Sequence, residues 1–257
     1  MAFSVAIQLF SLRNDLESDP RATLTAIKEM GYDGVEAHGF LEEKELAIIK
    51  ELGLKIPSGH ISLETLWEKT EYTFEFFKNM GAKYLVIPYM FPDNLPNEKN
   101  YEATVEKLKV LAEKAKDYGI TLCYHNHEAE FKKLDDGKYV IERVLSDVGN
   151  DNFGAQFDTA WMSVMGADAA AYIRSNPDAA KVIHLKDYYR HIDDDERPEM
   201  RPVGYGVMDI PRILDASKEV GCDWIIVEQD SPSLDKSALE CAKLSIDYIR
   251  TIVNYGK

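Results

Sequence analysis

The sequence predicts a single α/β domain, a (β/α)8 TIM barrel that spans residues 1–257. Short apolar runs alternate eight times with amphipathic runs, at intervals close to the roughly 30 residues that one strand and one helix occupy. Polar side chains also gather at the C-terminal ends of the apolar runs, where barrels of this type carry their reacting groups. A doubly wound open sheet is the structural alternative, and the regular count of eight favours the barrel.

The first half of the chain is expected to supply four strand and helix units. Asp19 and Pro20 begin a helix, because Asp caps free N–H groups and Pro is tolerated in the first turn. Each expected helix is followed by a glycine, which adopts the left-handed conformation common at helix ends. The expected strands are 4–10, 34–38, 55–60 and 83–89, and the expected helices are 20–30, 43–52, 63–80 and 101–118.

The second half continues the same alternation. Its longest irregular stretch is expected over 188–208, which is charged and contains Gly204-Tyr205-Gly206. That motif is too short to indicate a phosphate-binding loop. The expected strands are 121–127, 153–158, 181–187 and 224–230, and the expected helices are 139–148, 167–174, 210–220 and 237–253.

Residues within the strands alternate between two faces. In the run 181–187, Ile183 and Leu185 point to one side, whereas His184 and Lys186 point to the other. The same parity in the other strands gives an inward polar set and an outward apolar set. The inward set is Glu36, His38, His60, His125, His127, Gln156, Asp158, His184, Lys186 and Glu228.

Four strand ends offer a mixed set of nitrogen and oxygen ligands, namely His125, Asp158, His184 and Glu228. Such a set suits a divalent cation such as Mn²⁺, Zn²⁺, Co²⁺ or Mg²⁺ and does not select one of them. The cation would polarise a substrate carbonyl and stabilise the enediolate formed when a neighbouring proton leaves. Glu228, His125 or His127 is the expected base for that proton.

Glu36, His60 and Lys186 are expected to bind substrate, with pocket lining alone as the alternative for Glu36 and His60. Several of these residues also have structural explanations. His184 could be a hydrogen-bonded core histidine, Asp158 a helix cap, Glu228 a turn cap, and Lys186 the partner of a carboxylate in the barrel. Their coincidence at neighbouring strand ends favours a functional site.

Composition narrows the classes of partner. A net charge of -15 disfavours a nucleic acid partner, because a phosphate backbone would be repelled. No apolar run reaches the roughly 20 residues of a membrane span, and the first residues lack the basic segment of a secretory signal. The three cysteines form no CxxC pair, so neither a disulfide framework nor a thiolate zinc site is indicated. We expect a cytoplasmic enzyme that acts on a small molecule.

Several motifs together resemble the xylose-isomerase-like TIM-barrel superfamily of sugar phosphate isomerases and epimerases, over essentially the whole chain. The motifs are Gly31-Tyr-Asp-Gly-Val-Glu36, Ser58-Gly-His60, Tyr124-His-Asn-His-Glu128, Phe157-Asp158-Thr, Ile183-His-Leu-Lys-Asp187, Gly204-Tyr-Gly206 and Val227-Glu228. The resemblance implies a metal held by Glu, Asp, His and Glu, with the two glutamates exchanging a proton on opposite faces of the substrate. Asp158, His184 and Glu228 match this pattern.

The fourth ligand departs from the pattern, because the fifth strand carries histidines where the superfamily has glutamate. His125 aligns best with that ligand, followed by His127 and then Glu128. A histidine there resembles the inosose dehydratase branch and several uncharacterised isomerase-like branches. The main expectation is an isomerase or epimerase acting on a sugar, keto sugar or sugar derivative through an enediolate. A metal-dependent dehydratase and a non-catalytic sugar-binding barrel are the alternatives. The endonuclease IV branch fits poorly, because it needs more metal ligands and a basic surface.

Overall fold

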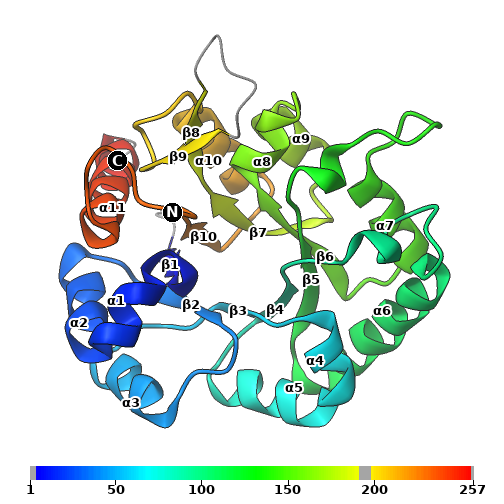
Figure 1. Ribbon diagram of the computed structural model, residues 1–257, viewed down its shortest axis with the longest axis horizontal. Coiled ribbons are helices and arrows are strands. Elements are labelled where there is room, and N and C mark those ends of the chain that lie inside the picture. The colour runs from blue at the N-terminus through cyan, green and yellow to red at the C-terminus, as the bar shows by residue number, and fades with distance from the viewer. Residues whose placement is uncertain (1–3, 191–197, 256–257) are drawn as a thin grey trace.

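Eight parallel strands close into a barrel in the computed structural model, which describes residues 4–190 and 198–255. β1 closes the ring by pairing with both β2 and β10. Figure 1 shows the strands at the centre and the helices around them. The barrel strands are β1 (Ser4–Gln8), β2 (Gly34–His38), β3 (Ser58–His60), β4 (Tyr84–Ile87), β5 (Thr121–His125), β6 (Phe153–Asp158), β7 (Ala180–Leu185) and β10 (Trp224–Val227). The predicted fold class is therefore confirmed.

The helices cover the outside of the barrel and follow the strands in the chain. Those close to the predicted ranges are α2 (Pro20–Met30), α3 (Glu43–Glu51), α6 (Tyr101–Ala115), α7 (Val140–Val148), α9 (Ala169–Ser175), α10 (Ile210–Glu219) and α11 (Ala238–Tyr255). Asp19 caps α2 as predicted, since its side chain accepts a hydrogen bond from the Ala22 N–H, and Gly31 ends α2 in the left-handed conformation.

Some helix predictions were wrong. The first strand ends at Gln8, and α1 (Arg13–Ser18) follows it after a 3-10 turn. α8 (Thr159–Val164) was also not predicted. The helix expected over 63–80 is divided into α4 (Leu63–Glu68) and α5 (Thr70–Asn79). Thr70 explains part of this break, because its hydroxyl donates to the carbonyl of Leu66 at 2.9 Å and so competes with backbone bonding.

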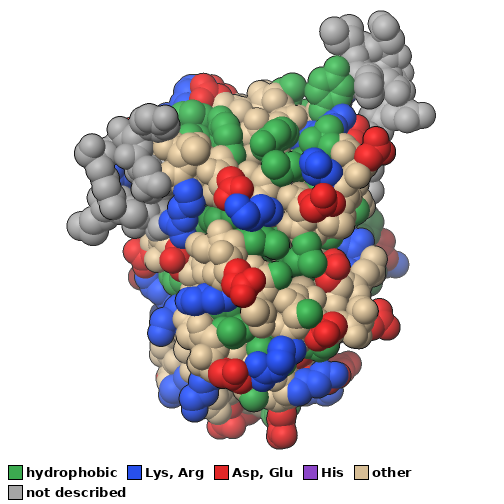
Figure 2. Space-filling model, turned by 90° about the vertical axis from the view of Figure 1, so that its left-hand side faces the viewer, with side chains coloured by type: hydrophobic (Ala, Val, Ile, Leu, Met, Phe, Trp, Pro, Cys, Tyr) green, Lys and Arg blue, Asp and Glu red, His purple; other side chains and the backbone are tan. Residues whose placement is uncertain are grey.

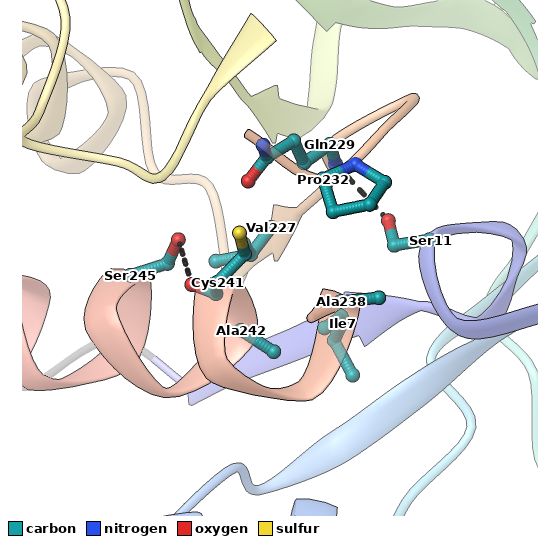
Figure 3. Close-up of a pocket in the computed structure, with 9 residues that line it drawn as sticks. All are labelled: Ile7, Ser11, Val227, Gln229, Pro232, Ala238, Cys241, Ala242 and Ser245. Carbon is teal, nitrogen blue, oxygen red and sulfur yellow. Dashed lines mark hydrogen bonds between the residues drawn. The ribbon is translucent and has the colours of Figure 1, made fainter. Parts of the chain in front are cut away.

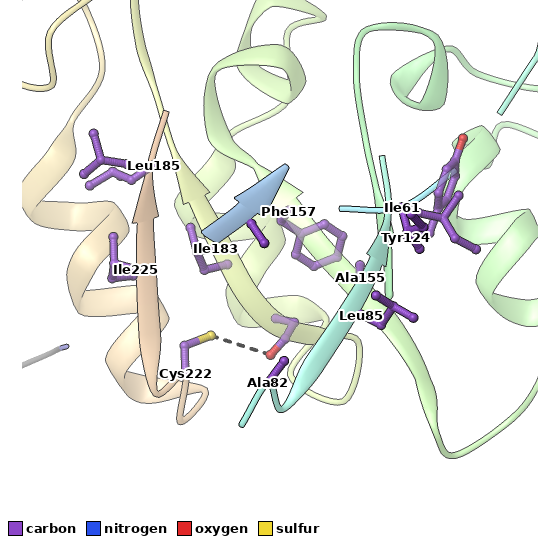
Figure 4. Close-up of a cluster of buried hydrophobic side chains, with 14 of the residues drawn as sticks. Ile61, Ala82, Leu85, Tyr124, Ala155, Phe157, Ile183, Leu185, Cys222 and Ile225 are labelled. Carbon is purple, nitrogen blue, oxygen red and sulfur yellow. Dashed lines mark hydrogen bonds between the residues drawn. The ribbon is translucent and has the colours of Figure 1, made fainter. Parts of the chain in front are cut away.

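The two faces of the strands are separated as the alternation predicts. The outward residues pack with the helices in the main apolar core, which Figure 4 shows in part. They include Val35, Leu122, Tyr124, Phe153, Phe157, Ile183, Leu185, Ile225 and Val227. A separate cluster that includes Val86, Cys123, Val182 and Ile226 lies on the opposite, interior face. The apolar interior fills the barrel, so the polar strand ends sit on a packed base.

The stretch after β7 is more regular than predicted. β8 (Asp187–Tyr189) pairs antiparallel with β9 (Glu199–Arg201), so β7 ends two residues before Asp187. The Asp187 carboxylate accepts hydrogen bonds from four backbone N–H groups, those of Tyr188, Gly204, Gly206 and Met208, at 2.9 to 3.1 Å. The N–H groups of Gly204 and Gly206 thus bind a carboxylate of their own chain.

Replacing Asp187 by Ala is expected to lower the free energy of unfolding by about 3 kcal/mol or more, because several N–H groups lose their acceptor. Chemical denaturation measures this loss. Asp209→Ala is the matched control, since the Asp209 side chain accepts one N–H bond, from Arg212, at the exposed start of α10. It should cost about 1 kcal/mol. Equal losses in the two variants would show that Asp187 does not hold the segment.

The surface carries charge of both signs. Figure 2 shows acidic and basic side chains interspersed over one face of the molecule. Within the described ranges, no helix is both long and apolar enough to cross a membrane.

Candidate active site

Four buried side chains from neighbouring strands meet at the C-terminal end of the barrel. His125 ends β5, Asp158 ends β6, His184 lies in β7, and Glu228 follows β10. One ligand atom from each lies within 4.8 Å of the others. The structure therefore brings together the four residues that the sequence predicted as metal ligands. His60 can form a second group with His125 and His184, so both groups belong to one cluster.

Asp158 gives the clearest sign that a cation fits here. Its Oδ1 accepts a hydrogen bond from the Trp161 N–H at 3.0 Å and so caps α8. A helix cap is the structural role that the sequence offered for Asp158. Its Oδ2 is buried and accepts no hydrogen bond, although Lys186 Nζ lies 3.1 Å away. Burial raises the pKa of Asp158 to about 6 despite the opposing charges of Lys186 and His184. A divalent cation would satisfy this oxygen and favour the ionised carboxylate.

The two histidines differ in their electrostatic surroundings. Burial and the neighbouring His184 hold the pKa of His125 well below its usual range, which favours a neutral ligand. Burial alone would lower the pKa of His184 too, but Glu36 and Glu228 outweigh it and raise this pKa to about 10. The Nδ1 of His184 lies 3.0 Å from Glu228 Oε2. A cation at this point would therefore take the place of a proton on His184.

Lys186 lies among carboxylate groups directly after β7. Its Nζ lies 2.7 Å from Glu228, 2.9 Å from Asp230 and 3.1 Å from Asp158, and its side chain is 1 % exposed. Burial opposes its charge, but the three carboxylates raise its pKa well above the usual value. Lys186 thus forms the ion pairs that the sequence left open as the alternative. In return, Lys186 and His184 hold the pKa of Glu228 well below its usual range despite burial.

Glu36 and His60 also lie deeper than a substrate contact requires. Glu36 is fully buried, and both of its carboxylate oxygens accept hydrogen bonds from other side chains. His60 is 5 % exposed, and its Nε2 lies 2.7 Å from Gln156 Oε1. Both carboxylate oxygens of Glu36 and the Nε2 of His60 therefore have partners within the protein, and a role of the pair in substrate binding stays a prediction.

His127 lies beyond the end of β5 and faces open space. It lines a cavity of about 490 Å³, a size suited to a small molecule, together with Phe10, Arg13, Trp161 and Asp230. Burial, followed by the charge of Lys186, lowers the pKa of His127 to about 4, so its ring is neutral near pH 7. The ring centroids of His127 and His125 are 4.8 Å apart, which places the cavity beside the ligand cluster.

The sequence missed Trp161 and Asp230 as parts of this site. Asp230 could have been predicted, because it lies two residues after Glu228 and residues two apart in a strand point to the same face. Trp161 could not have been predicted, because it lies in α8, a helix that the sequence did not indicate. Arg13 lies at the same cavity, and its guanidinium donates to the carbonyls of Phe10 and Asp230 at 2.7 and 3.2 Å.

A second cavity lies between β1, β10 and α11 and is drawn in Figure 3. Ile7, Val227 and Cys241 are among the residues that line it. Its volume of about 10 Å³ admits one water molecule at most. It is too small for a substrate and lacks the ligand cluster.

Comparisons with known proteins agree with this architecture. Residues 24–252 match the family model described as "Xylose isomerase-like TIM barrel". An inosose dehydratase of Mesomycoplasma hyopneumoniae is 23 % identical, over 90 % of this chain and 88 % of its own. A sugar phosphate isomerase/epimerase from Parabacteroides distasonis has a TM-score of 0.79 at 20 % identity, with 96 % of this chain and 97 % of that chain covered. The IolI protein with a bound zinc atom has a TM-score of 0.73 at 19 % identity, with 99 % of both chains covered. The protein belongs to the xylose isomerase-like TIM barrel family.

Proposed function

We propose that the protein is a divalent-metal-dependent isomerase or epimerase that removes a proton next to the carbonyl group of a sugar, keto sugar or sugar derivative. The observation that carries the proposal is the meeting of four candidate ligand side chains, among them Asp158, whose buried Oδ2 accepts no hydrogen bond. His125, Asp158, His184 and Glu228 would hold the cation. When bound, it supplies Lewis acidity at the oxygens of the substrate carbonyl and hydroxyl groups.

Glu228 is the proposed base. Its Oε2 lies beside the ammonium of Lys186 and the ring of His184, and these groups keep the carboxylate ionised, the form that can accept a proton. His127, on the wall of the neighbouring cavity, can position a substrate hydroxyl because its neutral ring offers both a donor and an acceptor. Proton return to the same or the neighbouring carbon would complete an epimerisation or an isomerisation.

A dehydratase is the second candidate, and His125 is the observation that favours it. His125 stands where the epimerase pattern has a second glutamate, so a symmetrical exchange between two carboxylates is not available at this strand end. The ammonium of Lys186, 2.7 Å from Glu228, can give a proton to a departing hydroxide. The similar protein from Mesomycoplasma hyopneumoniae is named an inosose dehydratase.

The proposed function is tested by incubating the protein with keto sugars and an inosose in deuterated water, after loading with Mn²⁺, Zn²⁺ or Co²⁺. NMR should show deuterium at the carbon next to the carbonyl group, because removal of that proton is common to both candidates. Mass spectrometry separates them, since only a dehydratase yields a product that has lost water. Absence of exchange and of product with every metal and sugar would contradict the proposal.

A further inference from the structure

Glu36 lies at the centre of a buried hydrogen-bond network that joins β2 to the ligand strands. Its Oε1 accepts hydrogen bonds from Ser58 Oγ at 2.5 Å and from Gln156 Nε2 at 2.6 Å. Its Oε2 accepts from Gln8 Nε2 at 2.7 Å and also contacts His184 Nε2. An ionised carboxylate has no proton to donate, so each partner must be the donor.

The orientation of the Gln156 amide is fixed by Glu36. Because its Nε2 donates to Glu36, its Oε1 is turned the other way and can only accept. That oxygen lies 2.9 Å from His125 Nδ1 and 2.7 Å from His60 Nε2. His125 therefore carries its proton on Nδ1. Its Nε2 keeps a free lone pair on the side of Asp158, whose Oδ2 is 3.8 Å away.

His184 contacts Glu36 directly. Its Nε2–H donates to Glu36, which leaves the lone pair of the neutral ring on Nδ1. This Nδ1 faces Glu228. One carboxylate therefore acts on both histidines, directly on His184 and through the amide of Gln156 on His125.

We propose that Glu36 is a positioning residue that sets the tautomers of both histidine ligands, so that His125 presents Nε2 and His184 presents Nδ1 to the cation. The inference rests on the proposed function, since it concerns the same metal centre. Partners of this kind orient ligand histidines in metalloproteins, and their loss typically weakens metal binding by about 10- to 100-fold. Glu36 contacts no substrate in this role.

The test compares Zn²⁺ affinities, measured by competition with a chelator. Glu36→Gln has nearly the same shape but presents one NH₂ group. If that group faces Gln156, the Gln156 amide must turn over, and His125 loses its Nε2 lone pair. If it faces His184, that ring must carry its proton on Nδ1. Either arrangement removes one ligand, so Zn²⁺ should bind about 10- to 100-fold more weakly. Ser58→Ala is the matched control, since it removes one donor to Glu36 and leaves both histidines unchanged; its affinity should equal that of the wild type.

A double variant tests whether the direction of the hydrogen bonds matters, or only the negative charge at position 36. In Glu36→Gln with Gln156→Glu, the new carboxylate at position 156 accepts from His125 and His60, and the amide at position 36 donates to it. The amide oxygen at position 36 still accepts from His184. Both tautomers are restored, so the Zn²⁺ affinity should recover relative to Glu36→Gln alone.

Two results would overturn the inference while leaving the proposed function intact: wild-type Zn²⁺ affinity in Glu36→Gln, or no recovery in a folded double variant. Failure of the wild type to bind Zn²⁺, Mn²⁺ or Co²⁺ would instead remove the metal centre and the inference with it. If Glu36→Gln does not fold, NMR of nitrogen-labelled histidines in the Zn²⁺-loaded wild type decides. Protons on His125 Nδ1 and His184 Nε2 support the inference, and the opposite tautomers overturn it.

Discussion

Glu228→Gln is expected to slow proton exchange on the substrate by about 10²- to 10⁴-fold, the usual contribution of a general base. Glutamine keeps the shape of the side chain and can still offer a carbonyl oxygen, but it cannot accept the proton. Lys186 and His184, which lie 2.7 and 3.0 Å from Glu228 Oε2, should remain in place. The rate is measured as deuterium incorporation by NMR, and metal content is determined on the same sample.

Asp230→Asn is the matched control for this variant. Asp230 also contacts Lys186, at 2.9 Å, but it lies outside the four-ligand group. The same loss of charge should therefore have a much smaller effect. Wild-type exchange in Glu228→Gln would assign the base to another residue, with His127 as the first choice. A wild type that binds metal and sugar without any exchange would favour the sugar-binding barrel.

The barrel was predictable because, within a strand, apolar residues that face the helices alternate with polar residues that face the interior. In β7, the alternation of Ile183 and Leu185 with His184 is sufficient to assign the inside and outside of the strand. The short elements were not predictable in this way. α8 has six residues and β9 has three, too few for either period to be recognised.

The cluster of candidate metal ligands was predictable for a related reason. His125, Asp158 and Glu228 are polar residues at the ends of apolar strands, and the barrel brings such ends together. The network beneath them was not predictable, because it depends on side-chain orientation. The hydrogen bond from Gln156 to Glu36 joins residues 120 positions apart, and no local sequence pattern predicts it. The same holds for Lys186. The alternation along the strand predicts that its side chain points inward, but not that it contacts three carboxylates.

Asp158→Asn is expected to weaken binding of a divalent ion by about 10²- to 10³-fold, because the site loses a buried charged ligand. The fold should persist. Asparagine keeps the Oδ1 that accepts the Trp161 N–H, so the cap of α8 survives. Lys186 also keeps Glu228 and Asp230 as partners. Metal content is measured by mass spectrometry on protein purified without chelator, and circular dichroism confirms the fold.

Asp168→Asn makes the same chemical change at an exposed helix cap outside the four-residue cluster. The Asp168 Oδ1 also accepts a helix N–H, that of Ala171 at 3.0 Å, and its carboxylate pairs with Arg212 at the surface. If metal loss came from a weakened helix cap, both variants would lose metal. If it comes from the ligand charge, only Asp158→Asn will lose it. Equal metal content in the wild type and in both variants would contradict the assignment of the site, because the buried Asp158 Oδ2, which accepts no hydrogen bond, would then not be a metal ligand.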